Sequence, residues 1–271
     1  MIGEENLEFK NLQHHIHTLA NLEEADESIV NCYLNLETRY REQFNERIRS
    51  LKGGIERPRR PAFWEAIGLI EVFLGTGIRP ESKGAAVFCR CGNRPFFLAL
   101  QFGAPLPNSL TVSSMPHIYH LVALKDNYYV AATLPPFLEF ENRECLAVAD
   151  RLHAETNGCG LVAVGTSSCL KALMEDRASM LVLSNTYAPD PAWLCSSCKE
   201  MVIAPGMPRE CDACKNQTFQ ALDTREEIVR LTERNGRPIE IVEHSAGMEA
   251  IGGIGCFLRY QALEWFDRPV A

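Results

Sequence analysis

Apolar positions recur at two different periods along the first half of the chain. Helical spacing of three and four residues is found in the segments 6–22, 38–51 and 61–74. Alternating or continuous apolar runs, which predict strands, are found at 29–36, 85–91, 96–102 and 128–134. Gly92-Asn93 separates two of these strands and is a favoured hairpin turn. The first half therefore predicts a small sheet accompanied by helices.

The second half alternates more regularly between the two periods. Helices are predicted at 140–155, 167–175 and 224–235, and strands at 161–164, 179–183 and 239–242. Strands that alternate with helices indicate a sheet covered by helices on both faces. Pro135-Pro136 is the expected boundary, giving an N-terminal domain 1–136 and a C-terminal domain 137–271. The predicted fold class is α/β, in two α/β domains.

Residues 193–217 interrupt this alternation with four cysteines in two close pairs. The pairs are Cys195-Ser-Ser-Cys198 and Cys211-Asp-Ala-Cys214, and the twelve residues between them are rich in Pro and Gly. Two such pairs predict a tetrahedral sulfur shell for Zn²⁺ on a hairpin-like zinc ribbon. Four thiolates leave no open coordination position, so the expected role of this Zn²⁺ cofactor is structural. The alternative is four ordinary reduced cysteines on a surface loop.

The remaining composition bears on the cellular compartment. Most of the other cysteines among the eleven lie in apolar segments, where a free thiol behaves as a small hydrophobic group. The acidic start at 1–10 has no apolar run typical of a secretory signal, and no stretch approaches the ~20 apolar residues that span a bilayer. We therefore expect a reduced, cytoplasmic protein with no membrane partner.

Charge is distributed unevenly along the chain. The net charge is −8, but residues 39–60 carry eight basic side chains against three acidic ones, a local +5 that leaves −13 for the rest. This segment combines two predicted helices with a loop beginning at Gly53-Gly54, so it predicts a helical hairpin with a basic tip. The candidate RNA contacts are Arg47, Arg49, Lys52, Arg57, Arg59 and Arg60. A solvated helix face with ion pairs is an equally good interpretation of the same residues.

The C-terminal half resembles the third domain of archaeal and eukaryotic class 1 peptide release factors. The matching segments are Val164-Gly165, Lys171-Ala172-Leu173, the strand 179–184, the paired cysteines, and the ending Gly252-Gly253-Ile254-Gly255 with Leu258-Arg259-Tyr260. The N-terminal half is similar to the decoding domain of the same factors in its layout. Together the two halves resemble the bacterial, Balon- and Pelota-like branch of this family, with a C-terminal fold like that of kink-turn-binding ribosomal proteins.

Three departures from the family limit what the resemblance implies. A release factor hydrolyses peptidyl-tRNA with a Gly-Gly-Gln loop in a middle domain, but neither Gly53-Gly54 nor Gly252-Gly253 is followed by Gln, and the middle domain is expected to be absent. The stop-codon-reading tip is replaced by the segment 53–60. The kink-turn pattern keeps Gly165 and Lys171 but has serines where the family has Asn and Glu. Peptide release, codon reading and kink-turn binding are therefore not expected.

The resemblance implies a non-enzymatic, ribosome-associated translation factor of hibernation or rescue type. It would bind ribosomal RNA through the hairpin tip and a translation-factor partner through the C-terminal domain. A generic zinc-containing interaction scaffold unrelated to the ribosome is the first alternative. The second is a hydrolase of peptidyl-tRNA or RNA, for which Gly165-Thr166-Ser167 is the nearest approach to a nucleophile elbow. Because the second glycine of that motif is missing, Ser167 is better interpreted as a helix cap, and no catalytic residue is predicted.

Overall fold

The computed structural model describes residues 5–23, 27–92, 94–124, 135–157, 160–243 and 245–260, with only the helical backbone given for 5–10 and 135–144. Contacts divide the chain into two compact units. One comprises Asn21–His120 and is called the hairpin unit below. The other combines Met1–Ala20 with Leu121–Ala271 and is called the C-terminal unit. Each unit contains a sheet and helices, so the predicted class of two α/β domains is confirmed.

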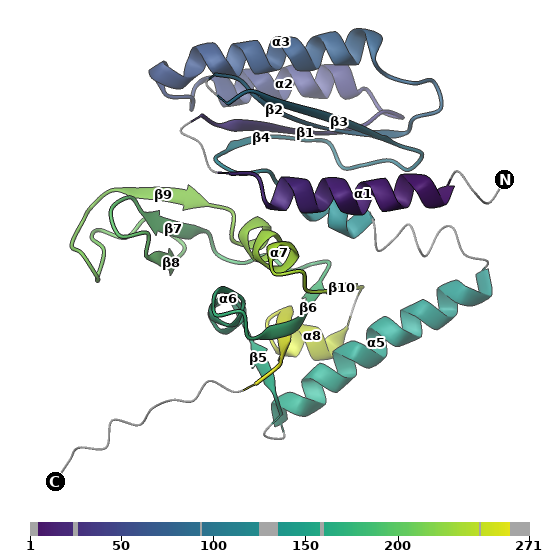
Figure 1. Cartoon of the computed structure of the whole chain (residues 1–271), viewed down its shortest axis with the longest axis vertical. Coiled ribbons are helices and arrows are strands. Elements are labelled where there is room, and N and C mark those ends of the chain that lie inside the picture. The colour runs from purple at the N-terminus through teal and green to yellow at the C-terminus, as the bar shows by residue number, and fades with distance from the viewer. Residues whose placement is uncertain are drawn as a thin grey trace. The chain divides into compact units, whose positions relative to one another are not determined.

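The hairpin unit contains one antiparallel sheet with the strand order β3-β2-β1-β4. Its strands are β1 (Ile29–Asn35), β2 (Gly84–Arg90), β3 (Phe96–Phe102) and β4 (Ser109–Ser113). Helices α2 (Tyr40–Lys52) and α3 (Arg60–Thr76) lie along one face of this sheet (Figure 1). The pairing of β2 with β3 through Arg90 and Phe96 confirms the hairpin predicted at Gly92.

The core of the hairpin unit forms between the sheet and these two helices. Alternate residues of a strand point to the same face, and the alternate positions Val30, Cys32 and Leu34 of β1 are all buried in this core. The apolar stripe of α3 packs onto them, and each of its residues is at most 5% exposed: Phe63, Ile67, Ile70 and Leu74. Burying the stripe fixes which way α3 is turned, and therefore which residues of the hairpin face solvent.

Gly84, the first residue of β2, is required by the close approach of a neighbouring loop. A Cβ at this position would collide with the carbonyl oxygen of Ala104 and lie 3.0 Å from the backbone nitrogen of Leu106. Replacing Gly84 with alanine is expected to lower the free energy of unfolding by about 1–3 kcal/mol, because backbone atoms must move. Gly103→Ala is the matched control, since nothing lies within 4 Å of a Cβ there. Urea denaturation of both variants checks this prediction, and equal midpoints would contradict it.

The C-terminal unit is built on a mixed sheet with the strand order β10-β6-β11-β5. Its strands are β5 (Val162–Val164), β6 (Ala178–Ser184), β10 (Ile239–Val242) and β11 (Ile254–Leu258). β10 runs parallel to β6, whereas β11 is antiparallel to both of its neighbours. The three parallel strands β5, β6 and β10 are those predicted from the alternating pattern, and the closing strand β11 reverses direction.

Helices cover both faces of this sheet, as the alternating pattern predicts. They are α5 (Pro135–Asn157), α6 (Thr166–Met174), α7 (Thr224–Arg234) and α8 (Ala246–Ala250). On one face, Leu152 of α5 and Met248 of α8 share a buried cluster with Val182 of β6. Leu181 and Leu183 flank Val182 in β6 and therefore point to the opposite face, where α6 and α7 pack.

Helix α1 (Glu5–Ala20) packs against α7 and belongs to the C-terminal unit. Gln13 donates a hydrogen bond of 3.2 Å to the carboxylate of Glu233 in α7. The sequence predicts this helix as part of the N-terminal domain, because contacts between distant segments leave no periodic signal. The predicted boundary at Pro135-Pro136 falls at the start of α5, and the strand predicted at 128–134 lies outside the described residues.

Arg259 lies in the ending of the sequence that resembles the release factors. Its side chain connects the end of β11 to the turn after α6 by hydrogen bonds. Its Nη2 lies 2.7 Å from Oδ2 of Asp176 and also donates to the carbonyl oxygen of that residue. Arg237 donates to Oδ1 of the same carboxylate over 3.2 Å. Hydrogen bonds from Arg237 and then Arg259 hold the pKa of Asp176 below its usual value. Part of the family-like ending therefore has a structural role in this chain.

No helix in the described part of the chain combines the length and apolar character needed to cross a bilayer.

Candidate metal centre and nucleic-acid interface

The four paired cysteines lie on a small separate sheet within the C-terminal unit. Its strands are β7 (Ala192–Cys195), β8 (Met201–Ile203) and β9 (Phe219–Leu222), in the order β8-β7-β9. The first pair begins at Cys195, the last residue of β7, and the second pair lies between β8 and β9. This arrangement of a hairpin plus a third strand is compatible with the zinc ribbon that the spacing predicts, and residues 192–222 are called the ribbon below.

The two cysteine pairs adopt the same local backbone structure. In the first, the backbone nitrogen of Lys199 donates to the carbonyl of Cys195 over 3.1 Å, and in the second Lys215 donates to Cys211 over 2.8 Å. Lys199 and Lys215 both have φ of +61°, the left-handed conformation that turns each loop back on itself. The sequence carries a signal of this match, since each pair belongs to a repeated Cys-x-x-Cys-Lys motif. The two equivalent turns therefore bring the four Sγ atoms close to one point.

The Sγ atoms meet at distances suited to a tetrahedral metal. Cys195 and Cys214 are 3.5 Å apart, as are Cys198 and Cys211, and all four atoms lie within 4.8 Å of one another. A tetrahedron with Zn–S bonds of about 2.3 Å has sulfur–sulfur separations of about 3.8 Å. The donor set and its spacing therefore fit Zn²⁺. Cys195 and Cys211 are buried, whereas Cys198 and Cys214 are exposed.

The electrostatics of the cluster favour a cation at its centre. A hydrogen bond from the backbone N–H of Cys198, supported by one from Ser197, lowers the pKa of the Cys195 thiol to about 6. Although the N–H of Glu200 favours the thiolate of Cys198, the neighbouring Sγ atoms of Cys214 and Cys211 raise the pKa of Cys198 to about 12. The thiolate is thus favoured at Cys195 and disfavoured at Cys198, and a divalent cation among the four sulfurs would favour the thiolate form of each.

The basic hairpin consists of α2, a short tip and α3. Helix α2 ends at Lys52, a 3-10 turn η1 (Arg57–Arg59) follows, and α3 begins at Arg60. The Nε of Arg60 donates to the carbonyl of Ile55 over 3.0 Å and closes the loop. Pro61 occupies the first turn of α3, where its missing N–H costs nothing. Arg60 therefore both shapes the tip and remains exposed at it.

All six candidate RNA-contacting side chains are exposed: Arg47, Arg49, Lys52, Arg57, Arg59 and Arg60. Arg59 pairs with Glu56 over 3.8 Å, and both side chains are at least half exposed, so the pair contributes little. Nothing in the described part of the chain forms an ion pair with the other five. Their charge is therefore available to a ligand.

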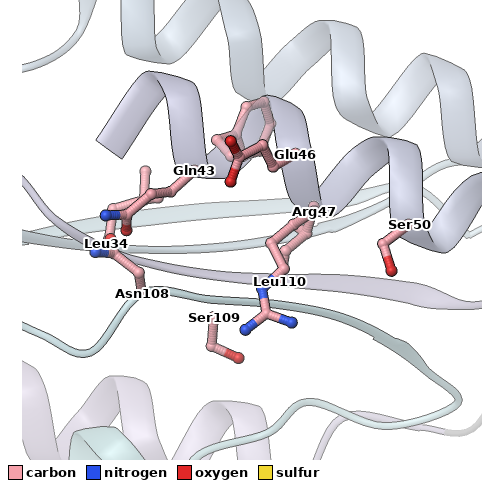
Figure 2. A pocket seen from close by; sticks show the side chains of 9 residues that line it. Leu34, Gln43, Glu46, Arg47, Ser50, Asn108, Ser109 and Leu110 are labelled. Carbon is pink, nitrogen blue, oxygen red and sulfur yellow. The ribbon is translucent and has the colours of Figure 1, made fainter. Parts of the chain in front are cut away.

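The structure separates Arg47 from the tip. Its side chain lines a groove of roughly 370 Å³ between α2 and the edge strand β4, with Ser50, Asn108 and Ser109 among the other lining residues. Figure 2 shows Arg47 reaching from α2 toward Ser109. Lys52 lies on the opposite flank of α2, since its Nζ is 5.9 Å from the ring of Trp64 in α3. The six basic residues thus form no single cluster.

Trp64 lies on the basic hairpin and is not among the site residues predicted from the sequence. It lies one helical turn after Arg60 and is 42% exposed, although large aromatic side chains normally bury most of their surface. The signal that could have found it is its position on α3, outside the stripe of core residues. It adds an exposed aromatic ring to the basic hairpin.

The structure corrects the interpretation of Ser167. Gly165, with φ of +80°, is the N-cap of α6, and no side chain caps this helix. Ser167 is exposed within the first turn, while Thr166 shares a hydrogen bond of 2.9 Å with the hydroxyl of Tyr187. The prediction that Ser167 caps the helix is therefore wrong, because the glycine turn places the helix start two residues earlier.

The sequence matches no protein-family model and no curated protein sequence. Solved structures that are similar to it include three translation factors. The C-terminal domain of a peptide chain release factor from Methanosarcina mazei is 22% identical, with 51% of this chain and 94% of that chain covered and a TM-score of 0.38. The archaeal translation termination factor aRF1 is 10% identical, with 93% and 98% covered and a TM-score of 0.35.

The third structure is Dom34 of S. cerevisiae, described as a translation termination-like factor. It is 12% identical, with 66% of this chain and 61% of that chain covered and a TM-score of 0.31. Because these TM-scores lie below 0.5, the fold described here rests on the sheet topology of the chain itself.

Proposed function

We propose that this protein is a ribosome-associated translation factor, of hibernation or rescue type, that contacts ribosomal RNA through its basic hairpin. The observation that carries the proposal is the tip, where Arg57, Arg59 and Arg60 are all exposed and two of them have no acidic partner in the described structure. Arginine side chains of this kind hold phosphates by paired hydrogen bonds. The sequence resemblance to class 1 release factors supports the ribosome as the source of those phosphates.

In this proposal the protein has no catalytic role. The Gly-Gly-Gln loop that performs peptide release in the family is missing from the sequence, and the proposal is that this chain lacks the middle domain that carries it. The residues at the tip differ from those that read stop codons in the family. The chain would therefore occupy a ribosomal site without hydrolysing peptidyl-tRNA there.

Zn²⁺ is proposed as the resident metal of the ribbon, held by Cys195, Cys198, Cys211 and Cys214 in a structural role. The convergence of the four Sγ atoms supports it. Short three- and four-residue strands bury little apolar surface, so a ribbon of this size depends on its metal for stability. The ribbon and the rest of the C-terminal unit would offer a surface to a translation-factor partner.

Sedimentation of native lysates through sucrose gradients tests the function. The protein is expected to migrate with ribosomal particles, and the gradient fraction in which it is found distinguishes two roles. Migration with 70S particles under stationary-phase or cold stress indicates hibernation, whereas migration with polysomes indicates rescue. Recovery only at the top of the gradient, in growing and stressed cells alike, would contradict the proposal.

A zinc-containing interaction scaffold unrelated to the ribosome is the second candidate. It is favoured by the exposed ion pair between Arg39 and Glu42, 3.6 Å apart, which is typical of a solvated helix face. Affinity capture separates the two candidates. The scaffold predicts a captured protein partner without ribosomal RNA, whereas the translation factor predicts that ribosomal RNA is captured.

A further inference from the structure

Trp64 lies where the basic hairpin leaves an aromatic ring uncovered. Its indole is 42% exposed on α3. On one side the buried ring of Phe63 meets it edge-on, with centroids 5.2 Å apart and planes 67° apart. On the α2 side the Nζ of Lys52 lies 5.9 Å from its centroid. The indole is therefore held in place by its neighbours, yet a large part of its surface remains in contact with solvent.

Gly68 keeps that surface open. Side chains on an α-helix lean toward the N-terminus, so the side chain at position 68 would extend over the residue four positions earlier, which is Trp64. Nothing lies within 4 Å of a Cβ built at Gly68, so packing does not require a glycine there. Glycine in a helix interior costs about 1 kcal/mol relative to alanine. The glycine therefore leaves the space above Trp64 on α3 free of a side chain.

Basic residues lie near Trp64 on both helices of the hairpin. Arg60 lies one turn before Trp64 on α3, Lys52 faces the ring from α2, and Arg57 lies in the turn that leads into α3. Glu65 is the adjacent acid, and it forms no ion pair with these three residues in the described structure. An aromatic surface bordered by positive charge suits a ligand that has both a flat π-system and phosphates.

We propose that Trp64 is a stacking platform for an unpaired RNA base, with Lys52 and Arg60 holding the phosphates on either side of the stacked nucleotide. Proteins that recognise single-stranded RNA combine aromatic stacking with basic side chains along the backbone in this way. A duplex hides the faces of its bases and does not fit such a platform. The inference rests on the proposed function, and it specifies that the RNA is unpaired where it meets the hairpin.

The test measures affinity of the full-length protein for a short single-stranded oligoadenylate and for a duplex RNA of the same length. Trp64→Ala is expected to weaken binding of the single strand about 5- to 150-fold and to change duplex binding little. Trp64→Phe should retain most of the affinity. The difference in fluorescence between wild type and Trp64→Phe isolates the emission of Trp64, and the single strand should quench it.

The Gly68→Leu variant separates base stacking on Trp64 from a purely structural role of that residue. The leucine side chain should cover the indole and weaken single-strand binding, while thermal stability is unchanged or higher because leucine favours the helix. Gly68→Ala is the matched control and should raise stability with little effect on binding.

The outcomes separate the stacking platform from the proposed function. If Trp64→Ala binds the single strand as wild type does while removal of the tip arginines weakens binding, the stacking platform is refuted and the RNA-binding hairpin stands. If the wild-type protein binds neither RNA nor ribosomes, the proposed function fails and the stacking platform fails with it.

Discussion

Replacing Cys195 with serine is expected to abolish stoichiometric zinc binding and to unfold the ribbon. Cys195 is a buried member of the four-cysteine cluster at the end of β7, and its loss would leave three sulfurs to hold a metal. Metal analysis of the wild-type protein should find about one zinc per chain, and the variant should hold far less. Trp193 reports the state of the ribbon, because its Nε1 donates to the carbonyl of Ala204 across β7 and β8. Its emission should shift to longer wavelength in the variant.

The same loss should follow chelation or acidification. Zinc binding displaces protons from the thiols, so the apparent affinity should fall as the pH is lowered. Ser197→Ala is the matched control, since it changes a side chain in the same turn but keeps the backbone N–H that faces the cysteines. The circular dichroism of the two four-stranded sheets should be unchanged, because the described ribbon strands pair with one another and not with those sheets. Well-folded wild-type protein without metal would refute the zinc site.

Replacing Arg57, Arg59 and Arg60 together with alanine is expected to weaken ribosome binding roughly ten- to a hundredfold at low salt. Each arginine that contacts a phosphate releases about one counterion, so the slope of log affinity against log salt should fall by about 3. Co-sedimentation with purified ribosomes over a range of salt concentrations measures both quantities. An unchanged affinity and slope would remove the tip from the proposal.

The control for this experiment removes the same charge elsewhere. Lys171, Arg209 and Arg234 are exposed residues of the C-terminal unit, and their triple alanine variant lowers the net charge equally. If that variant loses ribosome binding as strongly, the effect belongs to overall charge and not to the tip. Arg60→Lys tests the loop itself, because lysine keeps the charge but lacks the Nε that bonds to Ile55.

The features of this protein that depend on neighbours along the chain can be predicted from its sequence. Periodicity predicted β1, α2, α3 and the β2–β3 hairpin, because burial on one face imposes a fixed spacing. The spacing of Cys195, Cys198, Cys211 and Cys214 predicted a metal centre, since paired cysteines on tight turns converge. The basic tip was visible as a local excess of charge between two helices.

Features that depend on contacts between distant segments become visible once the chain is folded. Ser109–Ser113 was not predicted as a strand, because its polar residues form β4 only by pairing with β1. Helix α1 joins the C-terminal unit through α7, and Arg47 lies in a groove beside β4, apart from Trp64 and Lys52. Neither the packing of α1 nor the location of Arg47 has a signal in the neighbouring sequence. The side of a helix that faces a ligand is fixed only when its apolar stripe packs.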